Sequence, residues 1–456
     1  MRFAETLLLA GLLSGCEARS RMPHDARSGG TATVFDTTRD AFGQPSSWLT
    51  PAHRRAFFVG NSFFNLAWVS APASVVDRDG LGPLFNARSC SGCHFKDGRG
   101  QPPAAGSPFV SMLLRVSVPG VGPFGAPVPD PVYGDQIQSS ALPGFTAEAD
   151  VVVDYDEVPG RFPDGERYSL RRPRYRLERL GYGEPSGALL QSPRVAPAIV
   201  GLGLLEAVAQ AELAERVDPD DADRDGVSGR QNRVPEAKTG QLVPGRFGWK
   251  AEQPTVVQQC ASAFLGDMGL TSAVFAVENH TARQSACEGA PSGGSPEVGE
   301  HVLSAIGVYA RSLAVPARRN VDAPAVAHGE ELFARIGCAK CHVPTLHTAP
   351  LADLPELPAE PIHPYTDLLL HDLGEGLSDG RPAFAAEGRE WRTPPLWGLG
   401  LVGQVNGHTF LLHDGRARDV REAVLWHAGE GLAARNAFMA LTLDDRRALS
   451  AFVESL

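Results

Sequence analysis

Two copies of a short motif, Cys-x-x-Cys-His, constrain this chain more than any other feature. They lie at residues 90–94 and 338–342, in different parts of a 456-residue sequence. Two cysteines followed at once by a histidine are typical of covalent c-type haem attachment, in which the thiols bind the haem and the histidine ligates its iron. A zinc site usually needs two CxxC pairs close together, and a thioredoxin-like pair gives no reason for the histidine. The motifs predict two covalent haems, held by Cys90, Cys93, His94, Cys338, Cys341 and His342.

The N-terminal residues predict export of the chain. The apolar run at residues 7–13 follows Arg2 and is too short to cross a bilayer as a mature helix. It ends in Leu13-Ser-Gly-Cys16, which resembles a bacterial lipobox, so Cys16 would be lipidated; an ordinary secretory signal cut nearby is the alternative. A lipid-bearing cysteine anchors a protein without spanning the membrane. We expect a periplasmic protein anchored by lipid only, at the outer membrane in preference to the inner one.

The remaining cysteines and the net charge bear on compartment and partners. Cys260 and Cys287 are left after lipid and haem are assigned, and an oxidising compartment favours a disulfide between them, with two free buried thiols as the alternative. The net charge of −11 argues against a nucleic-acid partner. An acidic surface of this kind could also favour a basic electron donor.

The pattern along the chain predicts a mainly α fold with two cytochrome c-like haem domains, long loops and a few short β-strands. A helical pattern leads into the second motif, and a capping signal at Thr442 and Asp445 opens a final amphipathic helix. Short alternating runs within residues 100–185 indicate the strands. We expect a lipoprotein signal peptide at 1–15, a tether at 16–45, an N-terminal haem domain with insertions at 46–323 and a C-terminal cytochrome c-like haem domain at 324–456.

Several longer runs resemble the bacterial di-haem oxidoreductase family, and the resemblance covers roughly residues 50–456. Those proteins are described as peroxidases or thiol oxidoreductases, and they are related to di-haem cytochrome c peroxidases and di-haem rubber oxygenases. The runs are residues 80–94, 192–197, 201–207, 245–250 and 410–417.

The resemblance implies reduction of hydrogen peroxide, with electrons from a small cytochrome or cupredoxin-like donor entering through the second haem. One alternative is the oxygen- or peroxide-dependent oxidation of a protein, thiol or organic substrate. Another is a non-catalytic di-haem electron carrier.

For the second haem, the resemblance implies a sixth ligand beside the His-Asp-Gly at residues 413–415. Leu412 stands where the peroxidase relatives have methionine, so His413 is the predicted ligand and the second haem is predicted to be bis-histidine. A histidine that only orients a neighbouring group is the alternative. In that case the ligand would be His371, His408 or His427.

For the first haem, the order of Trp249, Gln259 and Asp267 matches the peroxidase pattern, with aspartate where the relatives have glutamate. By this resemblance Asp267, or alternatively Glu206, moves the protons of peroxide reduction as a general acid–base. Gln259 would bind the oxidant by a hydrogen bond, and Trp249 would relay electrons between the haems. Helix capping by Asp267 and space filling by Trp249 are the structural alternatives.

An acidic segment between the motifs predicts a candidate calcium loop. Asp221, Asp223 and Asp225 alternate and are followed by a glycine, as in the first half of an EF-hand loop. The twelfth position is Asn232 rather than glutamate, so the site would need ligands from elsewhere. A solvated acidic loop is the alternative.

Overall fold

The structure, a computed structural model, describes residues 26–456. The predicted signal peptide and lipidation site, Cys16, lie outside the described residues. The helices are α1 (Pro51–Asn65), α2 (Cys90–Cys93), α3 (Leu202–Glu206), α4 (Gln210–Ala214), α5 (Val256–Met268), α6 (Glu300–Ser312), α7 (Pro324–Arg335), α8 (Val402–Asn406), α9 (Val420–Trp426), α10 (Leu432–Ala440) and α11 (Leu443–Ser455).

Within residues 26–456, fourteen strands pair into seven two-stranded sheets. The pairs are β1 (Thr33–Val34) with β10 (Val315–Pro316), β2 (Leu84–Phe85) with β4 (Ser140–Ala141), β3 (Met112–Ser117) with β7 (Leu190–Val195), β5 (Asp150–Arg161) with β6 (Arg167–Glu178), β8 (Arg233–Pro235) with β9 (Leu242–Pro244), β11 (Leu346–His347) with β12 (Pro361–Ile362), and β13 (Leu370–Asp372) with β14 (Glu390–Arg392).

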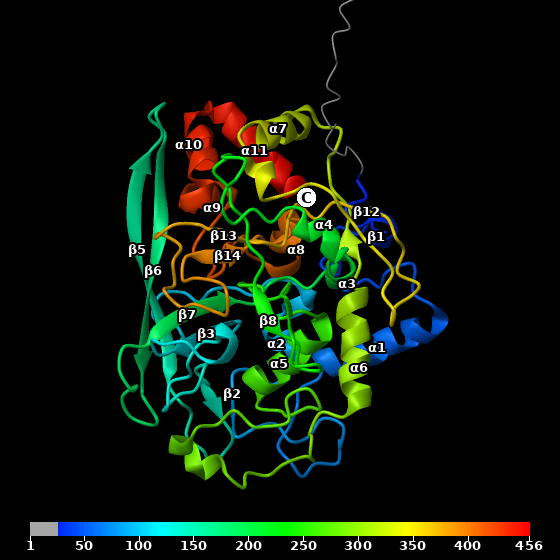
Figure 1. Cartoon of the computed structure of the whole chain (residues 1–456), viewed down its shortest axis with the longest axis vertical. Helices are drawn as coiled ribbons and strands as arrows, with labels where there is room; N and C mark the ends of the chain where they lie inside the picture. Colours follow the sequence, from blue (N-terminus) through cyan, green and yellow to red (C-terminus); the bar gives the residue numbers. More distant parts are fainter. Residues whose placement is uncertain (1–25) are drawn as a thin grey trace, which may run out of the picture.

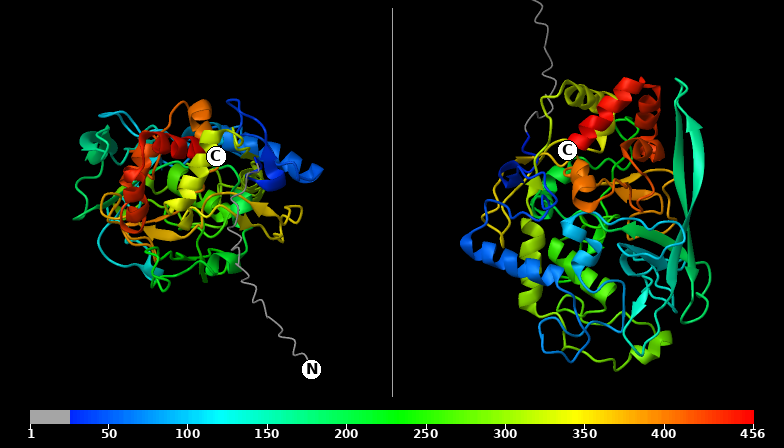
Figure 2. Two further views of the ribbon diagram at one scale, coloured as in Figure 1. Left: turned by 90° about the horizontal axis from the view of Figure 1, so that it is seen from above. Right: turned by 180° about the vertical axis from the view of Figure 1, so that it is seen from behind.

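The prediction of a mainly α chain with two cytochrome c-like domains is wrong. Helices account for 29% of the structure and strands for 19%, spread over several small sheets. The largest sheet is the β5–β6 hairpin, a ribbon of two twelve-residue strands that runs along one side of the molecule (Figures 1 and 2). Along much of these strands, charged and apolar side chains alternate. Alternation with a period of two places the apolar side chains on one face of a strand but not on one face of a helix.

Two pairs of helices form the helical framework around the motifs. α1 packs against α6 below the centre of Figure 1, and α7 packs against α11 at the top. A β-carbon at Gly60 of α1 would lie 2.1 Å from the carbonyl oxygen of Ala305, and one at Gly329 of α7 would lie 2.0 Å from that of Ala448. Only glycine permits such an approach between helix backbones, so the two pairs use the same contact.

Local sequence explains how α1 and α11 begin. Thr50 accepts a hydrogen bond from the backbone N–H of His53 at 3.2 Å and precedes Pro51, the first residue of α1. Thr442 caps α11 in the same way through the N–H of Asp445, also at 3.2 Å. Such caps satisfy backbone donors that have no partner inside the helix. The predicted start of the final helix is therefore confirmed.

The described part of the predicted tether is packed against the body. β1 runs parallel to β10, and Ala32, Ala41 and Phe42 are completely buried. Residues 26–45 are therefore not a free tether, because Ala32, Ala41 and Phe42 join the core beside α3 and α8. None of the helices within residues 26–456 combines the length and apolar character needed to cross a bilayer.

Candidate functional site

The first motif folds into one helical turn that presents its histidine for metal binding. α2 holds both cysteines, and the backbone N–H of His94 donates to the carbonyl of Cys90 at 2.9 Å. Nδ1 of His94 lies 2.8 Å from the carbonyl oxygen of Pro197. A backbone carbonyl can only accept, so Nδ1 carries the proton and Nε2 is left with its lone pair, the form in which an imidazole binds a metal.

The second motif repeats this geometry on different elements. His342 donates its backbone N–H to Cys338 at 3.0 Å, and its Nδ1 lies 2.9 Å from the carbonyl oxygen of Tyr365. Tyr365 has a φ of 55°, a left-handed conformation that is uncommon for a bulky residue. The rings of Phe64 and Phe333, on the helices before the motifs, each lie 6.2 Å from the adjacent motif histidine.

The motif thiols are free and suited to haem attachment rather than to disulfide exchange. All four are partly buried. Burial raises the pKa of Cys93 and of Cys338 to about 12, whereas reactive redox cysteines have a lowered pKa. Two neutral thiols beside a histidine with an available Nε2 fit a covalently attached haem at each motif.

The predicted sixth ligand, His413, is deeply buried. Its ring stacks on Trp391 with centroids 3.7 Å apart, and its backbone carbonyl accepts from Val195 at 2.8 Å. Trp391 pairs across the β13–β14 sheet with His371, whose Nδ1 lies 3.6 Å from Sγ of Cys341. Burial lowers the pKa of His413 to about 3. The ring of His413 is therefore neutral, and its role as the sixth ligand stays a prediction.

Two of the three alternative ligands already use both ring nitrogens. His371 lies between Asp367, at 2.8 Å from Nε2, and Glu430, at 2.6 Å from Nδ1. In His408, Nε2 lies 3.0 Å from the carbonyl of Arg99, and Nδ1 accepts from the N–H of Phe410 at 3.3 Å. These two rings are therefore held by protein groups.

His427, at the end of α9, has the best geometry of the four. Its Nδ1 lies 2.7 Å from the carbonyl of Ala423, one turn earlier, so Nε2 is available as in the two motif histidines. Burial is the main cause that lowers the pKa of His342 to about 4, and the charge of His427 lowers it further. That coupling places His427 near the second motif, and with its available Nε2 it is a second candidate for the sixth ligand beside His413.

Asp267, the predicted acid–base residue, lies next to the first motif on the last turn of α5. Its negative charge contributes to the raised pKa of both Cys90 and Cys93, after burial. Its Oδ1 accepts a hydrogen bond from Nε2 of Gln136 at 2.8 Å. Burial raises the pKa of Asp267, although Gln136 and the charge of Arg115 act in the opposite direction. A carboxyl of this kind holds a proton more readily than an ordinary aspartic acid does.

Glu206, the alternative acid–base residue, is engaged in a structural role. Its Oε1 accepts from the backbone N–H of Val256 at 2.8 Å, at the start of α5, and its Oε2 lies 2.6 Å from Nε of Arg311. Burial raises the pKa of Glu206 as well, but both of its oxygens are held, one by the start of α5 and the other by a cation on α6, so moving the carboxylate is costly. The structure therefore favours Asp267 for proton transfer.

Trp249 and Gln259, the remaining predicted residues, lie in the same region of the structure. Trp249 is buried, donates from Nε1 to the carbonyl of Val195 at 2.8 Å, and has the guanidinium of Arg99 5.3 Å from its ring. Val195 also donates its own N–H to the carbonyl of His413. One strand residue therefore contacts both the ring of Trp249 and the backbone of His413. Oε1 of Gln259 lies 3.7 Å from the position that a β-carbon of Gly248 would take. Gly248 directly precedes Trp249, so Gln259 lies close to this part of the chain.

The predicted disulfide is not formed. Cys260 and Cys287 are both free thiols. Cys260 packs on α5 near Glu206 and Arg311, whereas Cys287 lies near Tyr182 and Glu148. The two side chains face different neighbours. Counting the cysteines that remain after haem and lipid are assigned therefore could not establish the bond.

The acidic loop gathers a different set of carboxylates from the predicted one. Oxygens of Asp218, Asp221 and Asp223 lie within 4.8 Å of one another. Asp225 instead pairs with Lys340 of the second motif, with Oδ2 and Nζ 3.1 Å apart. The sequence pattern missed Asp218 because it lies before the alternating run.

Comparison with known proteins agrees with the family indicated by the motifs. A family model described as "Di-haem oxidoreductase, putative peroxidase" matches residues 23–456. Comparison with curated proteins and with solved structures gave no match. The match covers both motifs, Asp267 and His427.

Proposed function

The chain belongs to the di-haem oxidoreductase family, and from this premise we propose that it reduces hydrogen peroxide with electrons from a small donor protein. The observation that carries the proposal is the half-buried carboxyl of Asp267 beside the first motif, where Gln136 fixes one of its oxygens. Reduction of a peroxide consumes protons, and an acid with a raised pKa is suited to supply them.

In the proposed reaction, the two motifs have different roles. His94 and His342 would hold the haems through Nε2, and His427 would offer its own Nε2 to the second haem. The haems supply electron storage and the redox chemistry of the peroxide when bound. Asp267 gives and recovers protons on the first side, Gln136 orients its carboxyl, and Trp249 fills the space towards the second side.

The cellular location of the protein, its electron donor and a calcium site are part of the same proposal. Covalent haem attachment through CxxCH motifs and the lipobox-like sequence support an exported protein that is tethered to a membrane by lipid at Cys16. The net charge of −11 supports a donor with a basic contact surface. Calcium at Asp218, Asp221 and Asp223 would hold the acidic loop that Asp225 connects to Lys340.

Replacement of Asp267 tests the proposed chemistry. Asp267→Asn should keep both haems and slow peroxide reduction by about 10²-fold or more, the loss typical of a missing general acid–base. Steady-state turnover with a reduced cytochrome as donor measures this, with Asp322→Asn as a control because Asp322 is exposed. A loss of only a few-fold at Asp267 would instead favour oxygen-dependent oxidation or plain electron transfer.

A further inference from the structure

Asp267 needs a route by which protons reach it. Reduction of hydrogen peroxide to two water molecules takes up two electrons and two protons, so a carboxyl that supplies protons must be reloaded in every turnover. The Asp267 side chain is half-buried on the last turn of α5, and its Oδ1 is bound to Gln136. One side of this carboxyl therefore faces Gln136 and the residues behind it.

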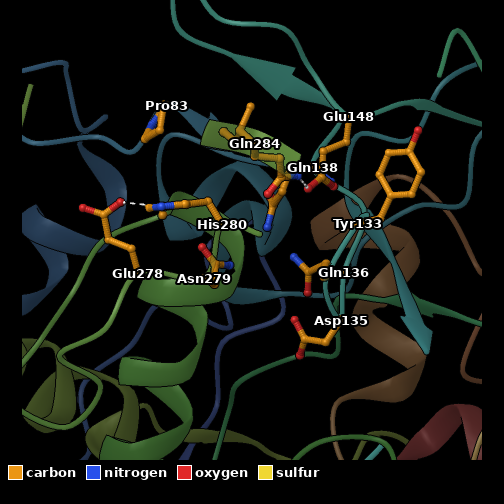
Figure 3. A pocket seen from close by; sticks show the side chains of 12 residues that line it. Pro83, Tyr133, Asp135, Gln136, Gln138, Glu148, Glu278, Asn279, His280 and Gln284 are labelled. Atoms are coloured by element: carbon orange, nitrogen blue, oxygen red, sulfur yellow. Dashed lines mark hydrogen bonds and ion pairs between the residues drawn. The ribbon is translucent and has the colours of Figure 1, made fainter. Parts of the chain in front are cut away.

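A small polar recess, with a volume of about 10 Å³ and room for about one water molecule, lies beside Gln136 (Figure 3). Gln136 and Gln138 both line it and are anchored to the end of α5, where each Nε2 donates to the carbonyl of Gly266, at 2.9 and 2.6 Å. Both side chains are almost completely buried, and their Oε1 atoms have no hydrogen-bond partner within the described structure. Buried acceptors of this kind are normally satisfied by ordered water.

Glu148 is the buried acid of this recess. One oxygen accepts from the backbone N–H of Gln138 at 2.5 Å, and the other is bound by Nε2 of Gln284. Only 3% of the residue is exposed, and the described structure gives its carboxylate no cationic partner. Burial raises the pKa of Glu148 to about 8, and the charges of Asp135 and Asp130 raise it further. Glu148 is therefore largely protonated at neutral pH.

The outer side of the recess carries groups that exchange protons with solvent. Asp135 is half exposed and pairs with Arg115 at 2.6 Å, and Arg115 is also one of the charges that act on Asp267. Glu278 and His280 lie 3.1 Å apart on the opposite side (Figure 3). The recess thus connects exposed titratable groups with the amide that holds Asp267.

We propose that this recess holds a water molecule bound to Gln136 and Gln138, and that Glu148 reloads Asp267 with protons through it. The inference rests on the proposed peroxide reduction. A proton leaves the Glu148 carboxyl for the bound water, the water passes a proton on to the Asp267 carboxylate, and solvent returns one to Glu148 past Asp135 and His280. No electrons move in this step. Glu148 is thus a proton-supplying residue, and Gln136 and Gln138 position the water.

The first test compares Glu148→Gln with Glu288→Gln, which makes the same change at an exposed residue. Both holoproteins should keep their two haems. Turnover of Glu148→Gln should fall at least about tenfold, less than the loss expected at Asp267, with a larger solvent deuterium isotope effect and partial rescue by added formic acid or imidazole. Glu288→Gln should match the wild type. A packing role of Glu148 would produce neither the isotope effect nor the rescue.

The second test does not depend on turnover. Because the folded pKa of Glu148 lies near 8 and its ordinary value is 4.5, the folded state binds more protons between these values, and stability falls as pH rises through that window. The Tm of the wild type should therefore decline relative to that of Glu148→Gln from pH 5 to 8. The titratable neighbours Asp130, Asp135, Tyr133, Tyr182, Cys287 and His280 are present in both proteins, so their contributions cancel.

The outcomes separate the two proposals. A wild-type protein without peroxide turnover would overturn the proposed function and the proton route with it. A wild type that turns over, with Glu148→Gln equal to Glu288→Gln in rate and isotope effect, would overturn the proton route alone. If Glu148→Gln does not fold, Gln138→Met decides the question, since it removes one water-binding amide and leaves Glu148 in place: slower turnover supports the route, and unchanged turnover overturns it.

Discussion

The regions around the two CxxCH motifs are alike on one side of the histidine and different on the other. Each histidine donates from Nδ1 to a carbonyl of a distant loop, Pro197 or Tyr365, and each motif is backed by a helix pair joined at a glycine. Beyond this shared arrangement, the first motif has the carboxyl of Asp267 beside it, and the second has the imidazole of His427. The features that both regions share suit the attachment of a haem. The residues that differ, Asp267 and His427, would determine what each haem does.

The acidic groups of the two regions show the same contrast. Around the first motif, burial raises the pKa of Asp97 to about 6 and that of Glu148 to about 8. Around the second, Glu430 has a pKa of about 2 because, against the effect of burial, hydrogen bonding to His371 and its charge favour the carboxylate. The pKa of Asp414 is also lowered, by Arg416 and His413. The first region can therefore exchange protons near neutral pH, whereas the second keeps fixed charges.

The largest predicted effect tests whether the two motifs are independent. The double variant Cys90→Ala/Cys93→Ala should lose one covalent haem, and Cys338→Ala/Cys341→Ala should lose the other. Haem-stained denaturing gels and intact mass spectra of protein matured with the cytochrome c machinery measure this. Each variant serves as the control for the other, and an intact mass without any haem adduct in the wild type would contradict the assignment of both motifs.

The next prediction concerns the sixth ligand at the second motif. His427→Ala should convert the second haem from low spin to high spin, because Nε2 of His427 is the available donor there. His413→Ala is the matched control and should leave the spin state unchanged. Electron paramagnetic resonance of the oxidised protein distinguishes the two. The reverse result would restore His413, which the family resemblance favoured, as the ligand.

The smallest effect tests the fixed charges of the second region. Glu430→Gln should lower the free energy of unfolding by about 1–3 kcal/mol at pH 7, since a buried hydrogen-bonded charge loses its partner. The folded pKa of Glu430, about 2, lies below its ordinary value of 4.5. Its contribution is therefore present above pH 4.5 and is lost as the pH falls towards 2. Denaturant unfolding at pH 7 and pH 3 should show the difference shrinking, and a constant difference would contradict the assignment.

The sequence predicted those features whose chemistry is local. The two motifs and the capped final helix are read from adjacent residues, and Asp267 was identified by the order of residues in the family pattern. The choice between His413 and His427 depends on the tertiary structure, because both histidines follow the motif in sequence and spacing along the chain does not show which Nε2 faces the second motif. Gln136 and Glu148 belong to no motif. Their roles depend on the loop that carries them meeting the end of α5, which no spacing along the chain indicates.

The paired helices have a consequence for the order in which the molecule can assemble. The contact at Gly60 joins α1 to α6, so it has to wait until residues near 305 have been synthesised, long after the first motif. The contact at Gly329 joins α7 to α11 over a much shorter stretch of chain. Closing a longer loop costs more entropy and slows folding. The cysteines at 90 and 93 thus lack their helical support until residues near 305 are available, whereas those at 338 and 341 lie within the shorter stretch that their own helix pair closes.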